Sequence, residues 1–336
     1  MSTIRIAING FGRIGRQCLR LALQSKKIKV IAVNDLSDIT VAAHLFKHDS
    51  VHPTYSGTVK GEGDILHIDD HSIAYLSKSD ISELPWEKLK VDLVLECTGR
   101  FITKTLASQH LVSGAKRVLV SAPCKDKVPT IVLGVNEHLY DPKKHTVVSN
   151  ASCTTNCVSM LLKVLKDELG LERALMTTVH AYTYDQHLLD NSHRDLRRAR
   201  AASISIVPTT SGATRSVVEI FPELEGHFEG LSVRVPTPDV SLVDLVAEVK
   251  KSVTVEKLNQ LFKKASETYL KKYLGISTEP LVSVDYIGDE RSAIVDCELT
   301  QVMEGKWVKV IAWYDNEVGF SKRMIDMVEY IYESEN

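Results

Sequence analysis

The stretch Ile8-Asn9-Gly10-Phe11-Gly12-Arg13-Ile14-Gly15 predicts the fold of the N-terminal half of the chain. It lies between a buried strand pattern at 4–8 and a helical pattern at 16–24. In a GxGxxG turn of this kind, the first glycine allows a tight turn and the second lets the backbone approach a pyrophosphate. The third lets the helix pack closely on the strand. We therefore expect a dinucleotide-binding turn at these three glycines.

An acidic residue follows at the spacing that such a turn requires. A second strand pattern at 28–33 ends in Asn34-Asp35, and Asp35 lies 20 residues after Gly15. A carboxylate there accepts hydrogen bonds from the ribose hydroxyls and repels a 2′-phosphate, which favours NAD over NADP. The alternative is a glycine-rich turn followed by a solvated aspartate. The order of strand, turn, helix and acid favours the NAD site.

Strand and helix patterns alternate through the first half of the chain. Short apolar strand patterns recur at 93–95, 118–120 and 147–148. This alternation predicts an α/β fold with a Rossmann-type, doubly wound parallel sheet, whose ligands bind beyond the carboxyl ends of the strands. The second half is rich in strand patterns and has an amphipathic helix pattern at 254–273. There we expect an α+β domain with a mixed, largely antiparallel sheet.

The length of 336 residues favours two domains. We expect an NAD-binding domain at 1–151 and a catalytic domain at 152–316. The residues at 317–336 form a helix pattern, and we expect this C-terminal helix to return to the first domain.

The composition argues against several functional classes. With a net charge of −2, the chain has no basic excess for nucleic acid or an anionic membrane, and no apolar run is long enough to span a bilayer. A strand pattern begins almost at the N-terminus, so we expect no signal peptide. The six cysteines include no CxxC pair, which favours free thiols, no metal site and a reducing, cytoplasmic compartment.

The segment Ser149-Asn150-Ala151-Ser152-Cys153-Thr154-Thr155-Asn156-Cys157 follows a short strand pattern and precedes a helical one. Cys153 is thus expected at a helix N-terminus, where free N–H groups and the helix dipole stabilise a thiolate or an oxyanion. The alternative is simple helix capping beside an inert cysteine. His180 ends a strand pattern and is of the type that activates a cysteine nucleophile. It is one of 12 histidines, and spacing alone does not pair it with Cys153.

These features resemble the phosphorylating glyceraldehyde-3-phosphate dehydrogenase family, over essentially the whole chain. Besides the two segments above, the similar motifs are Glu96-Cys97-Thr98-Gly99, Ser121-Ala122-Pro123, His180-Ala181-Tyr182-Thr183, Arg234-Val235-Pro236-Thr237-Pro238 and Asp315-Asn316-Glu317. The resemblance implies that the Cys153 thiolate attacks D-glyceraldehyde 3-phosphate and that His180 accepts the hydroxyl proton as hydride leaves for NAD. Inorganic phosphate then attacks the thioester to give 1,3-bisphosphoglycerate. A homotetramer acting in glycolysis or gluconeogenesis is implied as well.

The resemblance also implies two anion pockets and a set of cofactor contacts. The positions that match phosphate-binding residues are Ser152, Thr154, Thr183, Arg198, Ser211, Gly212 and Arg234. The positions that match cofactor-binding residues are Gly10, Gly12, Arg13, Ile14, Gly15, Asp35, Lys78, Ser121 and Asn316. The arginine-bearing segment at 182–208 is implied to line the cofactor site of a neighbouring subunit.

Two other functions fit the same residues less well. Erythrose-4-phosphate dehydrogenases share the cysteine and the histidine but hydrolyse the thioester, and the segments at 279–285 and 292–296 favour them. The segments Thr210-Ser211-Gly212-Ala213 and Ala122-Pro123 favour the phosphorylating family instead. A non-catalytic, NAD-binding regulatory protein would be indicated by loss of the cysteine or the histidine, and both are present.

Overall fold

The computed structural model describes residues 3–335, which form two compact units. The first unit comprises residues 3–131, 138–151 and 321–335, and the second comprises 132–137 and 152–320. Within residues 3–335, no helix combines the length and the apolar character needed to cross a membrane.

The first unit is built on an eight-stranded sheet with the order β3-β4-β5-β2-β1-β6-β7-β8. Each strand in the run β5-β2-β1-β6-β7-β8 pairs in parallel with the next, which confirms the predicted doubly wound sheet. An antiparallel meander of β3, β4 and β5 extends one edge. The strands are β1 (Ile4–Asn9), β2 (Ile28–Asn34), β3 (Val59–Glu62), β4 (Ile65–Ile68), β5 (His71–Leu76), β6 (Leu93–Glu96), β7 (Arg117–Val120) and β8 (Val147–Ser149).

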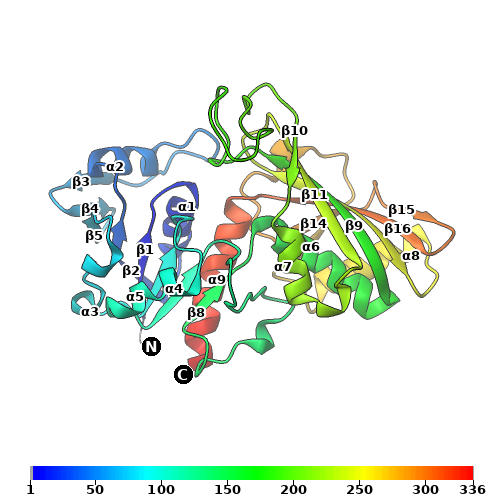
Figure 1. Cartoon of the computed structure of the whole chain (residues 1–336), viewed down its shortest axis with the longest axis horizontal. Helices are drawn as coiled ribbons and strands as arrows, with labels where there is room; N and C mark the ends of the chain where they lie inside the picture. Colours follow the sequence, from blue (N-terminus) through cyan, green and yellow to red (C-terminus); the bar gives the residue numbers. More distant parts are fainter. Residues whose placement is uncertain (1–2, 336) are drawn as a thin grey trace. The chain divides into compact units, whose positions relative to one another are not determined.

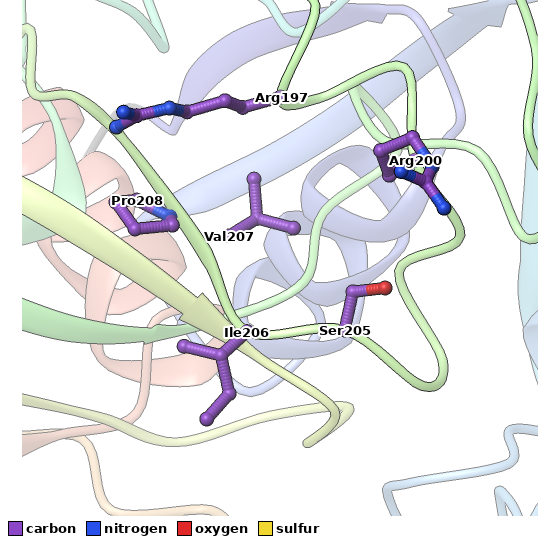
Figure 2. A pocket seen from close by; sticks show the side chains of 6 residues that line it. All are labelled: Arg197, Arg200, Ser205, Ile206, Val207 and Pro208. Carbon is purple, nitrogen blue, oxygen red and sulfur yellow. The ribbon is translucent and has the colours of Figure 1, made fainter.

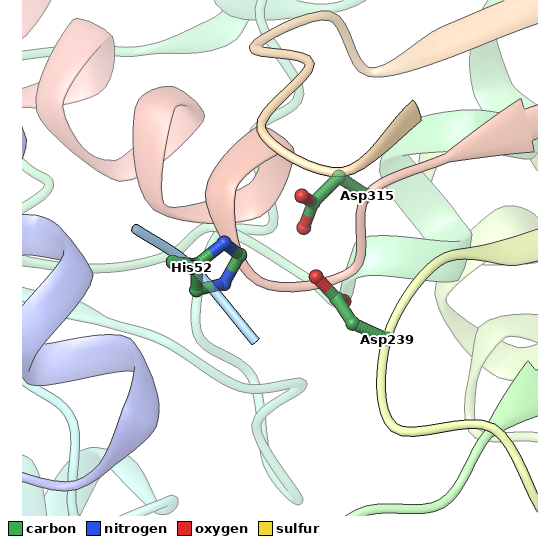
Figure 3. Close-up of side chains that lie close together, drawn as sticks. All are labelled: His52, Asp239 and Asp315. Carbon is green, nitrogen blue, oxygen red and sulfur yellow. The ribbon is translucent and has the colours of Figure 1, made fainter. Parts of the chain in front are cut away.

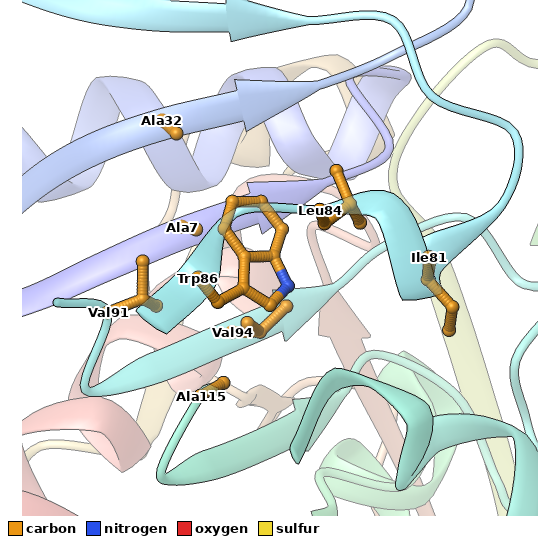
Figure 4. Packing of buried hydrophobic residues seen from close by; sticks show 8 residues of the cluster. All are labelled: Ala7, Ala32, Ile81, Leu84, Trp86, Val91, Val94 and Ala115. Atoms are coloured by element: carbon orange, nitrogen blue, oxygen red, sulfur yellow. The ribbon is translucent and has the colours of Figure 1, made fainter. Parts of the chain in front are cut away.

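Helices of the first unit pack against this sheet. Figure 1 shows α1 beside β1 and β2, and α1 begins three residues before the predicted helix because Gly12 is its N-cap. Trp86, at the start of α3, is fully buried in a cluster with Val91, Val94 and Ala115 (Figure 4). The helices are α1 (Arg13–Ala22), α2 (Ile39–Lys47), α3 (Trp86–Leu89), α4 (Lys104–Ala107) and α5 (Gln109–Val112); α9 (Val318–Glu335) supplies residues 321–335.

The second unit holds a mixed sheet with the order β10-β11-β9-β12-β16-β14-β13, and β15 pairs with β16. Most neighbours are antiparallel, whereas β11 pairs with β9 and β13 with β14 in parallel, as the sequence predicted for a mixed sheet. The strands are β9 (Leu171–Ala181), β10 (Val207–Thr210), β11 (Phe228–Val235), β12 (Ser241–Val249), β13 (Leu274–Ser277), β14 (Ala293–Asp296), β15 (Gln301–Met303) and β16 (Trp307–Tyr314). The helices are α6 (Cys153–Val164), α7 (Ala213–Ile220) and α8 (Val255–Glu267).

The glycine turn is the most constrained part of the first unit. Gly10 has a φ of +95°, and a Cβ on Gly15 would lie 2.1 Å from the Gly10 carbonyl oxygen. By contrast, a Cβ on Gly12 would meet no heavy atom of the described residues within 4 Å. Gly10 and Gly15 are therefore needed for the fold itself, and Gly12 leaves open space above the turn.

We expect Gly15→Ala to lower the free energy of unfolding by about 2 kcal/mol or more, because α1 must move away from the Gly10 carbonyl. Gly12→Ala is the matched control. Its backbone angles (φ −71°, ψ −160°) suit alanine, so its stability should stay within about 0.5 kcal/mol of the parent protein. Urea denaturation followed by circular dichroism measures both. Equal losses in the two variants would contradict this assignment.

Candidate active site

Cys153 is the first residue of α6, and Ser152 caps this helix. The Ser152 backbone is extended (φ −120°), and its Oγ accepts a hydrogen bond from the Thr155 N–H at 3.1 Å. The capping and the nucleophile interpretations of this segment are thus compatible. The cap fixes the helix start, and the sulfur lies among N–H groups that favour negative charge.

His180 lies next to this cysteine. It is the penultimate residue of β9, it is buried, and its Nε2 lies 3.4 Å from the Cys153 Sγ. A sulfur and an imidazole nitrogen at this distance can exchange a proton. The structure therefore brings together the two residues that sequence spacing could not pair.

Arg234 borders the imidazole on its other side. It lies opposite His180 in the parallel pairing of β11 with β9, and its Nη1 is 2.7 Å from His180 Nδ1. The Ala181 carbonyl oxygen lies close to both groups, 3.1 Å from Arg234 Nη1 and 2.7 Å from His180 Nδ1. Burial and the nearby guanidinium lower the pKa of His180 to about 3. The imidazole therefore has little tendency to hold a second proton unless a negative charge forms beside it.

The thiol is subject to opposing effects. Burial raises the pKa of Cys153, whereas the Arg234 charge and hydrogen bonds from Thr154 act to lower it. Transfer of the sulfur proton to His180 Nε2 would leave the net charge of the pair unchanged and place opposite charges 3.4 Å apart. The pair can therefore ionise together more easily than either group can alone.

A chain of buried hydroxyl groups lies beneath the pair. The Tyr314 hydroxyl is 2.8 Å from Thr154 Oγ1 and 2.9 Å from Thr178 Oγ1, which donates to the Leu242 carbonyl. The Tyr314 ring also packs edge-on against His180, with 6.0 Å between the centroids. Sequence analysis missed Tyr314 and Thr178. Their only signal was their place on strands next to the two motifs that carry His180 and Asn316.

The predicted ribose-binding acid lies at the carboxyl end of β2 in the first unit. Asp35 accepts hydrogen bonds from the Phe11 N–H at 2.7 Å and from Ser37 N–H and Oγ at 2.9 and 2.7 Å. Burial opposes its charge, but these hydrogen bonds lower the pKa of Asp35 overall. An ionised acid beside the open space over Gly12 fits the adenosine ribose and the pyrophosphate of a dinucleotide.

The other predicted cofactor residues are held by local contacts. Arg13, next to Ile14 at the start of α1, pairs with Asp49 at 2.9 Å, and Lys78 pairs with Glu83 at 2.9 Å. The Ser121 N–H donates to the Glu96 carbonyl at 3.0 Å, beyond the end of β7. Asn316 belongs to the second unit, where its Oδ1 accepts a hydrogen bond from Ser241 Oγ at 2.6 Å.

Comparison of the chain with known proteins identifies its family. Residues 4–104 match the glyceraldehyde 3-phosphate dehydrogenase NAD binding domain, and residues 152–316 match the C-terminal domain of the same family. The chain is 51% identical over 328 residues to the glyceraldehyde-3-phosphate dehydrogenases of Geobacillus stearothermophilus and Priestia megaterium, with 98% of each chain covered. It is 49% identical, with the same coverage, to glyceraldehyde-3-phosphate dehydrogenase 1 of Bacillus subtilis.

The chain belongs to the glyceraldehyde-3-phosphate dehydrogenase family. The resemblance stated from the sequence is therefore confirmed, and so is its assignment to the NAD-dependent oxidoreductases with NAD as the cofactor.

In this dehydrogenase, Arg198 lies on the long segment between β9 and β10. Its guanidinium donates to Thr209 Oγ1 at 2.9 Å and to the Thr210 carbonyl at 3.1 Å, and it forms a close ion pair with Asp185. Its charge lowers the pKa of both His180 and Arg234, so the cations of this region act on one another. Asp185 offsets part of the Arg198 charge, and the two guanidinium groups beside the imidazole still suit an anionic ligand.

The remaining predicted phosphate residues flank this region. Thr183 follows β9, and its carbonyl accepts from the Gln186 N–H at 2.9 Å. Ser211 and Gly212 precede α7, where the Ala213 N–H donates to Ser211 Oγ at 3.3 Å and Gly212 leaves the helix start without a side-chain cap.

The segment between β9 and β10 also forms a pocket of about 380 Å³. Figure 2 shows two arginines and four mostly apolar residues around it: Arg197, Arg200, Ser205, Ile206, Val207 and Pro208. Elsewhere on the segment the side chains of Leu188, Leu196 and Ile204 are exposed. Apolar exposure of this kind is typical of a surface that contacts another molecule.

Asp239 and Asp315 form a second feature that sequence analysis missed. Their carboxyl groups face each other (Figure 3), and Asp315 accepts hydrogen bonds from the N–H groups of Gly288, Glu317 and Val318. Burial, together with the charges of Asp315 and Glu317, raises the pKa of Asp239 to about 9. Asp239 is therefore protonated at neutral pH and shares its proton with Asp315. Asn316 follows directly in the chain.

We expect Asp239→Asn to gain stability relative to the parent protein as the pH rises from 5 to 8. The folded protein keeps a proton on Asp239 up to a pH of about 9, whereas the unfolded chain loses it above a pH of about 4. Each pH unit in between costs the parent fold at most about 1.4 kcal/mol, and asparagine, which also donates to Asp315, avoids this cost. Urea denaturation midpoints at pH 5, 6.5 and 8 measure the difference. Parallel pH dependences would refute it.

Proposed function

We propose that this chain oxidises D-glyceraldehyde 3-phosphate to 1,3-bisphosphoglycerate, with NAD and inorganic phosphate as co-substrates, in glycolysis or gluconeogenesis. The observation that carries the proposal is the 3.4 Å contact between Cys153 Sγ and His180 Nε2 at the start of α6. The names of the relatives, which are all glyceraldehyde-3-phosphate dehydrogenases, support the choice of aldehyde.

In the first step, the Cys153 thiolate attacks the aldehyde carbon. The sulfur forms the new bond, and the carbonyl oxygen takes the proton held on His180 Nε2, which gives a thiohemiacetal. The N–H groups at the start of α6 stabilise the oxygen while it is negatively charged. His180 is buried and Cys153 is partly buried, which limits the water that can compete for the aldehyde.

In the second step, His180 acts as the general base. Its low pKa keeps the imidazole neutral, and with the single proton on Nδ1, 2.7 Å from the Ala181 carbonyl oxygen, Nε2 accepts the hydroxyl proton of the thiohemiacetal while the carbon loses hydride. Bound NAD supplies the acceptor for that hydride. The product is a thioester on Cys153, which retains the energy of the oxidation because a thiolate is a good leaving group.

In the third step, an oxygen of inorganic phosphate attacks the thioester, and the Cys153 thiolate leaves. We propose that Arg234 and Arg198 bind the phosphate groups, because both guanidinium groups act on the His180 imidazole. Side-chain hydroxyls and backbone N–H groups complete the two anion sites. They come from Ser152, Thr154, Thr183, Ser211 and Gly212.

We further propose a cytoplasmic homotetramer with the domain limits 1–151, 152–316 and 317–336 stated above. The exposed apolar side chains between β9 and β10, such as Leu188 and Leu196, support assembly, since burying them against another subunit is favourable. The six free cysteines of the described chain support a reducing compartment.

We expect Cys153→Ser to reduce NADH formation by roughly 10³-fold or more, because serine is a weaker nucleophile and a poorer leaving group. NAD binding should be unchanged, since the cofactor residues proposed in the first unit are untouched. Stopped-flow absorbance at 340 nm and calorimetric titration with NAD measure the two effects. A variant that kept most of its activity would refute the thioester mechanism.

NADH formation should also depend on inorganic phosphate after the first turnover. Without phosphate, we expect a burst of about one NADH per active site followed by slow hydrolysis, because the acyl group stays on Cys153. Arsenate or phosphate should restore steady turnover. Phosphate-independent turnover with erythrose 4-phosphate as the better substrate would instead indicate the hydrolytic sister activity.

A further inference from the structure

Glu96 is a buried acid that the mechanism above does not use. It ends β6 in the first unit, and its side chain is fully buried. One oxygen lies 2.6 Å from Asn9 Nδ2 and 3.0 Å from His110 Nε2, and the other accepts from the Thr98 N–H at 2.7 Å and from the Thr98 hydroxyl. A buried acid with four partners is costly to assemble unless each partner donates to it.

The protonation of His110 follows from its other neighbour. Trp86 Nε1 lies 3.0 Å from His110 Nδ1, and an indole N–H can only donate, so Nδ1 carries no proton. The single proton of the neutral imidazole is therefore on Nε2, where it points to Glu96. Trp86 is held by the apolar cluster around it (Figure 4), which fixes the direction of its N–H. All four groups around the Glu96 carboxylate are thus donors.

These hydrogen bonds join the ends of three strands. Asn9 and Glu96 are register partners in β1 and β6, and Asn34, at the end of β2, donates from Nδ2 to Asn9 Oδ1 at 2.8 Å. β1 lies between β2 and β6, which is the point where the strand order reverses and where a doubly wound sheet binds its ligand. The network therefore runs directly beneath the cofactor crevice.

The same acid fixes two turns that border this crevice. Glu96 accepts hydrogen bonds from both the backbone N–H and the hydroxyl of Thr98. The Thr98 backbone in turn lies against Gly10, because a Cβ on Gly10 would lie 2.7 Å from the Thr98 nitrogen. The turn after β6 and the turn that opens the glycine motif thus rest against each other. A displacement of Thr98 has to displace Gly10 as well.

We propose that Glu96 is a positioning residue for NAD binding, which acts through Thr98 and Gly10 and is kept in its four-donor arrangement by His110 and Trp86. A carboxylate is required because it offers acceptors on both oxygens. A glutamine at this position would turn its amide N–H groups either toward Thr98 or toward Asn9 and His110, where it would meet other donors.

The first test is Glu96→Gln, with calorimetric titration of NAD into the full-length protein in the absence of aldehyde. We expect the dissociation constant and the KM for NAD to rise about tenfold, while kcat at saturating NAD changes less than twofold. Glu62→Gln is the matched control, because Glu62 is exposed in the same unit and pairs with Lys60, and it should bind NAD as the parent does. Because the titration measures NAD alone, its failure would not bear on the proposed thioester chemistry.

The second test uses the tautomer of His110. In a Trp86→Phe background, Nδ1 is free to carry the proton, so Nε2 can accept from a glutamine at position 96. Glu96→Gln should then cost less than threefold in NAD affinity, which a double-mutant cycle reports as coupling. Equal losses in the two backgrounds would overturn the role of the tautomer.

A purely structural role for Glu96 predicts a different pattern. The unfolding midpoint of Glu96→Gln would fall while NAD affinity at 25 °C stayed unchanged, and this result would overturn the proposal. If Glu96→Gln fails to fold, Thr98→Val decides, since it removes one donor to Glu96 and keeps the backbone N–H. A severalfold weaker NAD affinity in Thr98→Val supports the proposal, and an unchanged affinity refutes it.

Discussion

The register of β9 against β11 is the constraint on which the active site depends. It places Arg234 opposite His180, and burial together with the guanidinium 2.7 Å away lowers the pKa of the imidazole to about 3. A slip of one residue would turn the histidine to the other face of the sheet, away from the start of α6. The chemistry of Cys153 is thus determined by strand pairing that lies outside its own motif.

The sequence predicted the features that depend on local order. The glycine turn, the acid at Asp35 and the helix start at Cys153 each follow from a short run of residues whose conformational demands are specific. The contact of Cys153 with His180 could not be predicted in this way, because it depends on the pairing of β9 within a sheet of distant strands. Tyr314 was missed for the same reason, since a buried tyrosine on a strand is most often part of a core.

Each unit contains a buried polar network, and its hydrogen bonds hold the participating side chains in one position. Beneath Cys153, the hydroxyl groups of Thr154, Tyr314 and Thr178 hold the helix start against the sheet. Such networks tolerate little change, because a donor or acceptor that loses its partner inside a protein costs more than the hydrogen bond contributed. They keep the reacting groups and the turns in place without covering them, so that ligands retain access.

Glu96 and Asp239 show how the surroundings of a buried acid determine its charge. Both side chains are almost fully excluded from solvent. Around Glu96 the neighbours are donors, including a histidine whose tautomer is fixed by an indole, so both oxygens of the acid serve as acceptors. Asp239 faces Asp315 and Glu317, so it keeps its proton up to a pH of about 9. A buried acid therefore serves as an acceptor of hydrogen bonds in one unit and keeps its proton in the other, and the difference follows from the groups that face it.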